Sequence, residues 1–122
     1  MTAPRKIFDL ERDGDALIAV PLRNLGSLAE EELQSELPEL LRAIAQPDAR
    51  HLVLDFSRIS YFGSSMLEAV RRLARQAREH GGRTALCGLS PVAREILEIA
   101  RFDTLWPLCE TREDALAAVR KV

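Results

Sequence analysis

Residues 51–73 constrain the fold of this chain more than any other stretch. They begin with an apolar run from Leu52 to Leu54, whose lack of alternation is typical of a strand covered on both faces. A short polar and aromatic connection follows, and an amphipathic segment opens at the pair Ser64 and Ser65. A buried strand that leads into a helix is the repeating unit of a parallel sheet, so this stretch predicts an α/β fold.

Apolar patterns along the rest of the chain predict the other elements of such a fold. Short apolar or alternating runs predict strands at residues 6–12, 16–20, 51–56, 83–87 and 105–108. Apolar residues at three- and four-residue spacing predict helices at residues 27–45, 64–80, 90–100 and from 111 onward. The order ββαβαβαβα predicts a mixed and mostly parallel sheet of four to five strands with four helices. We expect residues 1–5 to form a flexible tail and residues 6–122 to form a single domain.

Single polar residues and prolines set further expectations for the helices. Ser27, Ser90 and Thr111 each precede a predicted helix and are expected to cap it. Pro91 should occupy the first helical position of the third helix. Pro38 is expected to kink or interrupt the first helix, because proline lacks a backbone donor. The residues expected on the inner face of the third helix are Val92, Ile96, Leu97 and Ala100.

Charge and composition argue against several classes of function. The 122 residues include 17 basic and 19 acidic side chains, so the net charge of −2 gives no support for nucleic-acid binding. No apolar run approaches the roughly 20 residues of a membrane span, and the first residues do not resemble a signal peptide. We therefore expect a cytoplasmic protein. Cys87 and Cys109 lie in apolar runs and are expected to be reduced residues in or near the core.

The serine pair does not have the sequence surroundings of a catalytic nucleophile. Gly63-Ser64-Ser65 lacks the second glycine of a nucleophile elbow. His51 is expected at the far end of the central strand, and His80 ends the helix that Ser64 begins, about 24 Å away at 1.5 Å per residue. Because neither imidazole is expected to reach Ser64, the sequence argues against a hydrolase.

Two other chemistries also lack the residues they need. Asp55 follows a buried strand, as a phospho-accepting aspartate does, but residues 13–15 form a hairpin turn where an acidic magnesium site would be required. The sequence contains no glycine-rich phosphate loop. Arg71, Arg75 and Arg78 recur on one side of the second helix and are interpreted as a solvated face. We thus expect no enzyme activity, no cofactor and no metal.

The residues alone leave two interpretations of the helix start open. A serine at this position can simply cap the first turn, which stabilises a helix by about 1 kcal/mol. Its hydroxyl also faces solvent, where another protein can reach it. Residue type alone favours the cap.

The segment at 55–67 adds a family resemblance to this interpretation. Its sequence, Asp-Phe-Ser-Arg-Ile-Ser-Tyr-Phe-Gly-Ser-Ser-Met-Leu, resembles the signature of the STAS domain, which occurs in bacterial anti-sigma factor antagonists and in the cytoplasmic part of sulfate transporters. The family pattern is a strand ending in Asp or Asn, an apolar-polar-aromatic stretch, and Asp-Ser-Ser/Thr-Gly-Leu opening a helix. The likeness extends to residues 81–82, 87–91 and 99–102 and implies a STAS-like fold for nearly the whole chain.

The resemblance implies a protein-binding switch of the anti-sigma factor antagonist type. In that family an anti-sigma factor with serine kinase activity phosphorylates the serine after the motif Asp, which corresponds to Ser64, with Ser65 as the second choice. The unphosphorylated antagonist binds the anti-sigma factor and frees the sigma factor, and a serine phosphatase resets the phosphorylated form. We expect a monomer or weak dimer with no nucleic-acid or membrane partner. The partner-binding residues implied are Asn24, Leu25, Gly26, Ser27, Phe62, Gly63, Ser64, Ser65 and Met66, with the exposed side of the second helix.

The chain departs from the family pattern close to Ser64. Gly63 replaces the motif Asp, Met66 replaces the usual Gly, and residues 23–26 read Arg-Asn-Leu-Gly where the family has Gly-Glu-Leu-Asp. Because glycine permits backbone angles that Asp resists, we expect a differently shaped loop at Gly63. Two alternatives stay open. One is an unphosphorylated STAS scaffold in a signalling assembly, and the other is a STAS module that senses a nucleotide or lipid near Arg23 and Gly63.

Overall fold

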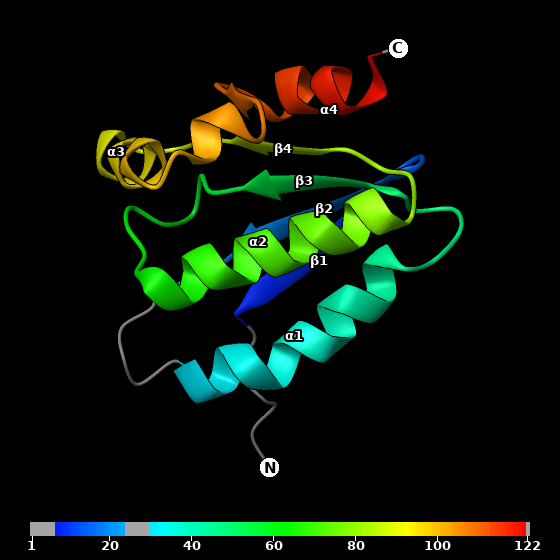
Figure 1. The fold of residues 1–122 in the computed structure, drawn as a ribbon, viewed down its shortest axis with the longest axis horizontal. Helices are drawn as coiled ribbons and strands as arrows, with labels where there is room; N and C mark the ends of the chain where they lie inside the picture. The colour runs from blue at the N-terminus through cyan, green and yellow to red at the C-terminus, as the bar shows by residue number, and fades with distance from the viewer. Residues whose placement is uncertain (1–6, 24–29, 122) are drawn as a thin grey trace.

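A five-stranded sheet forms the centre of the computed structural model, which describes residues 7–23 and 30–121 (Figure 1). The strands are β1 (Phe8–Asp13), β2 (Ala16–Pro21), β3 (His51–Asp55), β4 (Thr84–Cys87) and β5 (Leu108–Cys109). They lie side by side in the order of the sequence. β1 is antiparallel to β2 and the other pairs are parallel. The predicted α/β class with a mixed, mostly parallel sheet is confirmed.

Helices cover both faces of this sheet. The described residues form α1 (Glu30–Ile44), α2 (Ser64–Glu79), α3 (Pro91–Ile99) and α4 (Arg112–Arg120), with a short 3-10 helix, η2 (Phe102–Thr104). α1 and α2 lie side by side against one face, and α4 packs on the other (Figure 1). The element order matches the prediction, with η2 added before β5.

The central strands are apolar without alternation because both of their faces are buried. In β3, Leu52 and Leu54 belong to the core cluster under α1 and α2, whereas Val53 belongs to the cluster under α4. Leu17 and Ile18 of β2 divide between the two clusters in the same way. This arrangement is the one that the uninterrupted run at 52–54 predicts.

Two predicted helix caps are present in the structure. The Ser90 hydroxyl accepts a hydrogen bond from the Ala93 N–H at 3.1 Å, with Pro91 at the first position of α3. The Thr111 hydroxyl accepts one from the Asp114 N–H at 3.1 Å. The third predicted cap, Ser27, lies outside the described residues.

Of the two effects predicted for Pro38, a kink or an interruption of the helix, the interruption of α1 is wrong. The helix runs without a break from Glu30 to Ile44 with Pro38 inside it. Pro38 and Gln34, whose carbonyl loses its helical donor, are both exposed, so water can satisfy that carbonyl. Burial of the opposite face, at residues such as Leu37 and Leu40, then outweighs the lost hydrogen bond.

The last strand and the third helix also differ from expectation. Leu105 and Trp106 continue the turn after η2, where both of their N–H groups donate to the Phe102 carbonyl, and β5 begins only at Leu108. In α3 the buried residues are Ala93 and Leu97, while Val92 is 55% exposed. The predicted inward position of Val92 is therefore wrong. Ile96 is partly buried against the core, as expected.

The two cysteines occupy neighbouring strands. Cys87 is buried in β4, which confirms its predicted core position, and burial raises the pKa of its thiol to about 12. Cys109 lies opposite it in β5 and is partly buried.

Candidate functional site

The connection between β3 and α2, residues 56–63, is the candidate site. It leaves the sheet at the carboxyl end of the central parallel strand, where open α/β sheets place their functional residues. Phe56, Ile59 and Phe62 point into the core and are at most 6% exposed. The rings of Phe56 and Phe62 lie 5.1 Å apart. These buried aromatic and aliphatic side chains fix the path of the connection.

A row of exposed residues alternates with the buried ones. Tyr61 is 47% exposed, which is unusual for a large aromatic side chain. The Ser90 hydroxyl donates a hydrogen bond to the Ser60 carbonyl at 2.6 Å and so ties the connection to the start of α3. The exposed members of this surface, called the Ser64 surface below, are Ser57, Arg58, Ser60, Tyr61, Gly63 and Ser64.

Asp55, at the end of β3, holds the first turn of the connection. One of its carboxylate oxygens accepts a hydrogen bond from the Ser57 N–H at 3.0 Å. The other accepts two from Arg112 of α4, at 3.0 Å from Nε and 2.9 Å from Nη2. Burial works to raise the pKa of Asp55, but the hydrogen bonds from Ser57 and Arg112 outweigh it and hold the pKa below its usual value.

Gly88 approaches the same carboxylate closely. Its φ of +70° lies in the left-handed region, and a Cβ on it would stand 2.9 Å from the carboxylate oxygen of Asp55 and from the Ser57 backbone nitrogen. A glycine is therefore required here by both conformation and space. Sequence reasoning grouped Gly88 only with a family segment and did not foresee this contact.

Arg112 also joins the edge of the sheet to this region. Its guanidinium donates to both carboxylate oxygens of Glu11 in β1, at 3.0 and 3.3 Å. The hydrogen bonds that Arg112 donates to Glu11 and Asp55 raise the pKa of Arg112 above its usual value. Sequence analysis missed this role because Arg112 is 57 positions from Asp55 and 101 from Glu11.

Ser64 is the first helical residue of α2 and is exposed. The N-cap position belongs to Gly63, and no side chain caps the helix. The interpretation of Ser64 as a capping residue is therefore wrong by one position. The first turn of α2 contains no acidic residue, so the partial positive charge of the helix start is not neutralised there by a carboxylate.

Gly63 adopts an ordinary backbone conformation. Its φ of −105° and ψ of −166° are extended angles that any residue can take, and a Cβ would meet no atom of the described residues within 4 Å. The expectation that Gly63 shapes the loop through unusual angles is thus wrong. The backbone at this position can carry a side chain such as that of aspartate without conformational strain.

The structure divides the predicted partner-binding residues into separate groups. Gly63 and Ser64 are exposed and Ser65 is partly buried. Phe62 and Met66 are 3% and 0% exposed, so they do not lie on the partner-binding surface, contrary to expectation. They pack beneath it. Their burial follows from the core cluster under α1 and α2, to which both belong. Residues 24–27 lie outside the described part of the chain.

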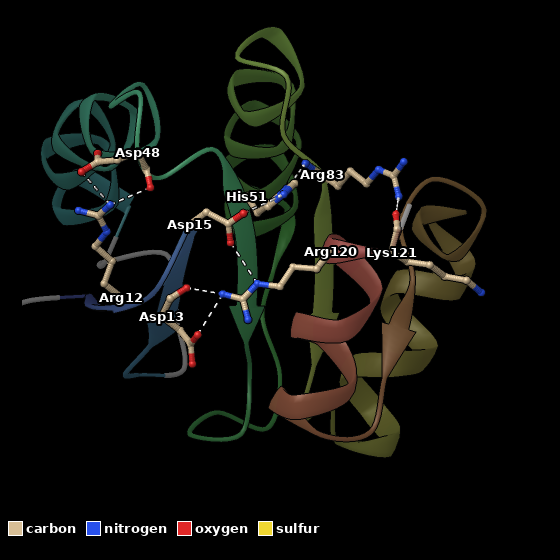
Figure 2. Close-up of polar contacts among 8 residues, drawn as sticks. All are labelled: Arg12, Asp13, Asp15, Asp48, His51, Arg83, Arg120 and Lys121. Atoms are coloured by element: carbon tan, nitrogen blue, oxygen red, sulfur yellow. Dashed lines mark hydrogen bonds and ion pairs between the residues drawn. The ribbon is translucent and has the colours of Figure 1, made fainter.

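His51 lies at the opposite end of β3 from the Ser64 surface, as expected. Its Nδ1 accepts a hydrogen bond from the Arg83 N–H at 3.0 Å, and its Nε2 lies 3.6 Å from a carboxylate oxygen of Asp15 (Figure 2). Arg120 links Asp13 and Asp15 of the neighbouring hairpin turn at the same end (Figure 2). His51 thus belongs to a structural polar network and is not placed to act as a base for Ser64.

Two further properties bear on function. Within residues 7–23 and 30–121, no group of three or more His, Cys, Asp or Glu side chains is arranged to hold a metal ion. No helix in the described part is long and apolar enough to cross a membrane.

Comparison with known proteins identifies the family. The STAS domain family matches residues 26–115. The chain is 36% identical over 104 residues to BtrV of Bordetella bronchiseptica, which is named as an anti-sigma factor antagonist. The match covers 85% of this chain and 86% of BtrV.

Solved structures agree with this match. SpoIIAA, an anti-sigma factor antagonist in its unphosphorylated form, superimposes with a TM-score of 0.76 at 25% identity over 94% of this chain and 97% of that chain. A Thermotoga maritima protein described as an anti-sigma factor antagonist has the same fold, with a TM-score of 0.78 at 18% identity over 93% of this chain and 95% of that chain. The chain belongs to the STAS domain family.

Proposed function

We propose that this chain is an anti-sigma factor antagonist that binds an anti-sigma factor through the Ser64 surface. The observation that carries the proposal is the exposed Ser64 at the first position of α2, on a connection anchored by buried side chains. The 36% identity to BtrV supports the same function. The role is regulatory binding without catalysis by the chain itself, which agrees with the position of His51 far from Ser64.

Ser64 is the proposed phosphorylation site and Ser65 the second choice. A phosphate adds about −1.5 to −2 charges and three acceptor oxygens. At the first position of α2 these oxygens would lie next to unpaired helix N–H groups and the positive end of the helix dipole. No carboxylate in the first turn opposes that charge. The folded domain can therefore accept the phosphate without local unfolding.

Phosphorylation would then change the surface and leave the fold intact. The charged group would stand in the centre of the Ser64 surface, where a bound partner would have to desolvate or repel it. The hydrogen bond from Ser90 to Ser60 and the buried Phe56 and Phe62 limit how far the connection can move away. Loss of partner binding is the expected consequence.

Phosphorylation in vitro tests the site. The chain is incubated with the kinase-type anti-sigma factor of its source organism and ATP, and the product is mapped by mass spectrometry. We expect phosphate on Ser64 in the unaltered chain and in Ser65→Ala, and none in Ser64→Ala. Phosphate on neither serine would overturn the switch and favour an unphosphorylated STAS scaffold.

Binding to the same anti-sigma factor tests the surface. Calorimetry should give a dissociation constant at least about tenfold weaker for Ser64→Asp than for the unaltered chain, because the new charge lies in the contact. Ser35→Asp places the same change on the exposed side of α1 and serves as the control, with unchanged binding. Equal binding of all three proteins would place the contact elsewhere.

A further inference from the structure

A cleft with arginines on its walls lies between the second half of α2 and the segment that precedes β5. Its volume is about 500 Å³, which is within the range of small-molecule sites. Arg71, Arg75, Arg78, Arg83, Leu105 and Trp106 contribute to its lining. Ser64 is not among the lining residues, so the cleft is separate from the Ser64 surface.

The cleft concentrates positive charge. Arg71, Arg75 and Arg78 recur at four- and three-residue spacing and therefore share one side of α2, while Arg83 directly precedes β4. Among the residues that the structure describes, no acidic side chain lines the cleft. None of its four arginines forms an ion pair with a carboxylate of the described residues. Their charge is available to an anion from solvent.

Two of these arginines are held in position by the protein. The guanidinium of Arg71 lies over the ring of Phe102, 5.2 Å from its centroid. The guanidinium of Arg83 donates to the backbone carbonyl of Lys121 (Figure 2). A guanidinium fixed by such contacts loses less conformational freedom when it binds an oxyanion.

The opposite wall of the cleft is apolar. Trp106 packs edge-on against Phe102 with ring centroids 5.0 Å apart, and Leu105 is 55% exposed. An apolar wall facing a row of arginines suits a ligand with an organic part and a charged part. The carbonyl end of α2 does not favour an anion, so the guanidinium groups must supply the attraction.

We infer that this cleft binds a small molecule that carries two or more phosphate groups. Guanidinium groups recognise phosphate through paired, charge-assisted hydrogen bonds. Three arginines along α2 can contact phosphates that are linked in a row, and a single phosphate would use only part of the wall. The site is independent of the proposed function and does not require Ser64.

The single tryptophan of the chain makes the inference measurable, because Trp106 lines the cleft. Titration with inorganic tripolyphosphate should change the Trp106 fluorescence in a saturable way, and calorimetry should give one site per chain. ATP as a second probe tests whether an organic group adds affinity. Vesicles that contain phosphatidic acid test a lipid headgroup as the source of phosphate.

Variants locate the site. The double change Arg75→Gln and Arg78→Gln should weaken binding of tripolyphosphate at least about tenfold. Arg72→Gln removes a charge from an exposed residue of the same helix that does not line the cleft, and it should leave binding nearly unchanged. Circular dichroism checks that all variants fold.

Absence of saturable binding, equal weakening by Arg72→Gln, or binding to vesicles alone would overturn the inference. Unchanged binding by Ser64→Ala would separate this site from the proposed switch.

Discussion

Arg112 donates two hydrogen bonds to a single carboxylate oxygen of Asp55, although the two residues are 57 positions apart. The pair joins α4 to the carboxyl end of β3, one residue before the connection that leads to Ser64. The side chain of Asp55 is 8% exposed and that of Arg112 is 33% exposed. The pair therefore positions the connection from the face of the sheet that α4 covers, which is opposite to the face under α2.

Removal of this pair should destabilise the domain. Arg112→Ala leaves the buried carboxylate of Asp55 without its charged partner, and we expect a loss of about 1–3 kcal/mol in the free energy of unfolding. Arg94→Ala breaks an exposed pair with Glu98 at 3.8 Å and should cost less than about 0.5 kcal/mol. Urea unfolding measures both values. Equal losses in the two variants would contradict the proposed role of Arg112.

Acid should weaken the fold through Asp55. Because the pKa of Asp55 is lowered in the folded state, its contribution is complete above the unfolded pKa of about 3.9 and is lost as the pH falls through the folded pKa. The free energy of unfolding of the unaltered chain should therefore decline between about pH 5 and pH 2. Asp55→Asn should be less stable at pH 7 and show a shallower decline. A parallel decline in both proteins would assign the acid sensitivity to other carboxylates.

Acidification should also lower the free energy of unfolding through His51, in a pH range above that of Asp55. Burial lowers the pKa of His51, against the opposing effect of Asp15, and the neutral ring accepts the Arg83 N–H on Nδ1. A lowered histidine pKa gives stability that is present above the unfolded pKa of about 6.5 and is lost as the pH falls below it. Chemical denaturation from pH 8 to pH 5 should show this loss. His80→Gln, a change at an exposed histidine, should retain the loss and His51→Gln should abolish it.

An aspartate at position 63 should stabilise the protein. Gly63 is the N-cap of α2 with extended angles, and a Cβ added there would meet no atom of the described residues within 4 Å, so Gly63→Asp adds a capping carboxylate at the positive helix end. We expect a gain of a few tenths of a kcal/mol up to about 1 kcal/mol by thermal and urea unfolding. Gly88→Ala, at a φ of +70°, should instead destabilise by more than about 1 kcal/mol. A loss of stability in Gly63→Asp would show that the glycine has a structural function.

Thiol reactivity should distinguish the two cysteines. Burial raises the pKa of Cys87 to about 12, so almost no thiolate forms at pH 8 in the folded protein. Cys109 is only partly buried, and burial raises its pKa. With a disulfide reagent at pH 8, Cys109 should react first, and Cys87 only at the rate of unfolding. In the Cys109→Ser variant only Cys87 remains to react. A fast reaction of this variant with the reagent would contradict the buried position of Cys87.

The elements with strong local patterns could be predicted from the sequence. The apolar run at 52–54 required burial on both faces, and the serine and proline at 90–91 marked the start of α3. Ser64 was located near the helix start, but its place relative to the cap depends on backbone angles that residue type does not determine.

The features that were predicted wrongly or not predicted at all depend on tertiary contacts. Phe62 belongs to a connection without periodicity, so its burial against Phe56 could be known only from the fold. The pairing of Arg112 with Asp55 joins residues 57 positions apart and leaves no local signal. The cleft beside Trp106 lies where Leu105 and Trp106 continue the turn after η2, at the expected beginning of the last strand.

The position of Ser64 inside a helix has a consequence for substrate recognition. Many kinases bind an acceptor in an extended peptide, but Ser64 carries helical backbone angles and is held by a connection with buried anchors. A kinase that modifies this residue has to accommodate the start of a folded helix and the surface around it. A short peptide covering residues 58–70 would lack that shape, so the enzyme would select the whole domain and not its linear sequence.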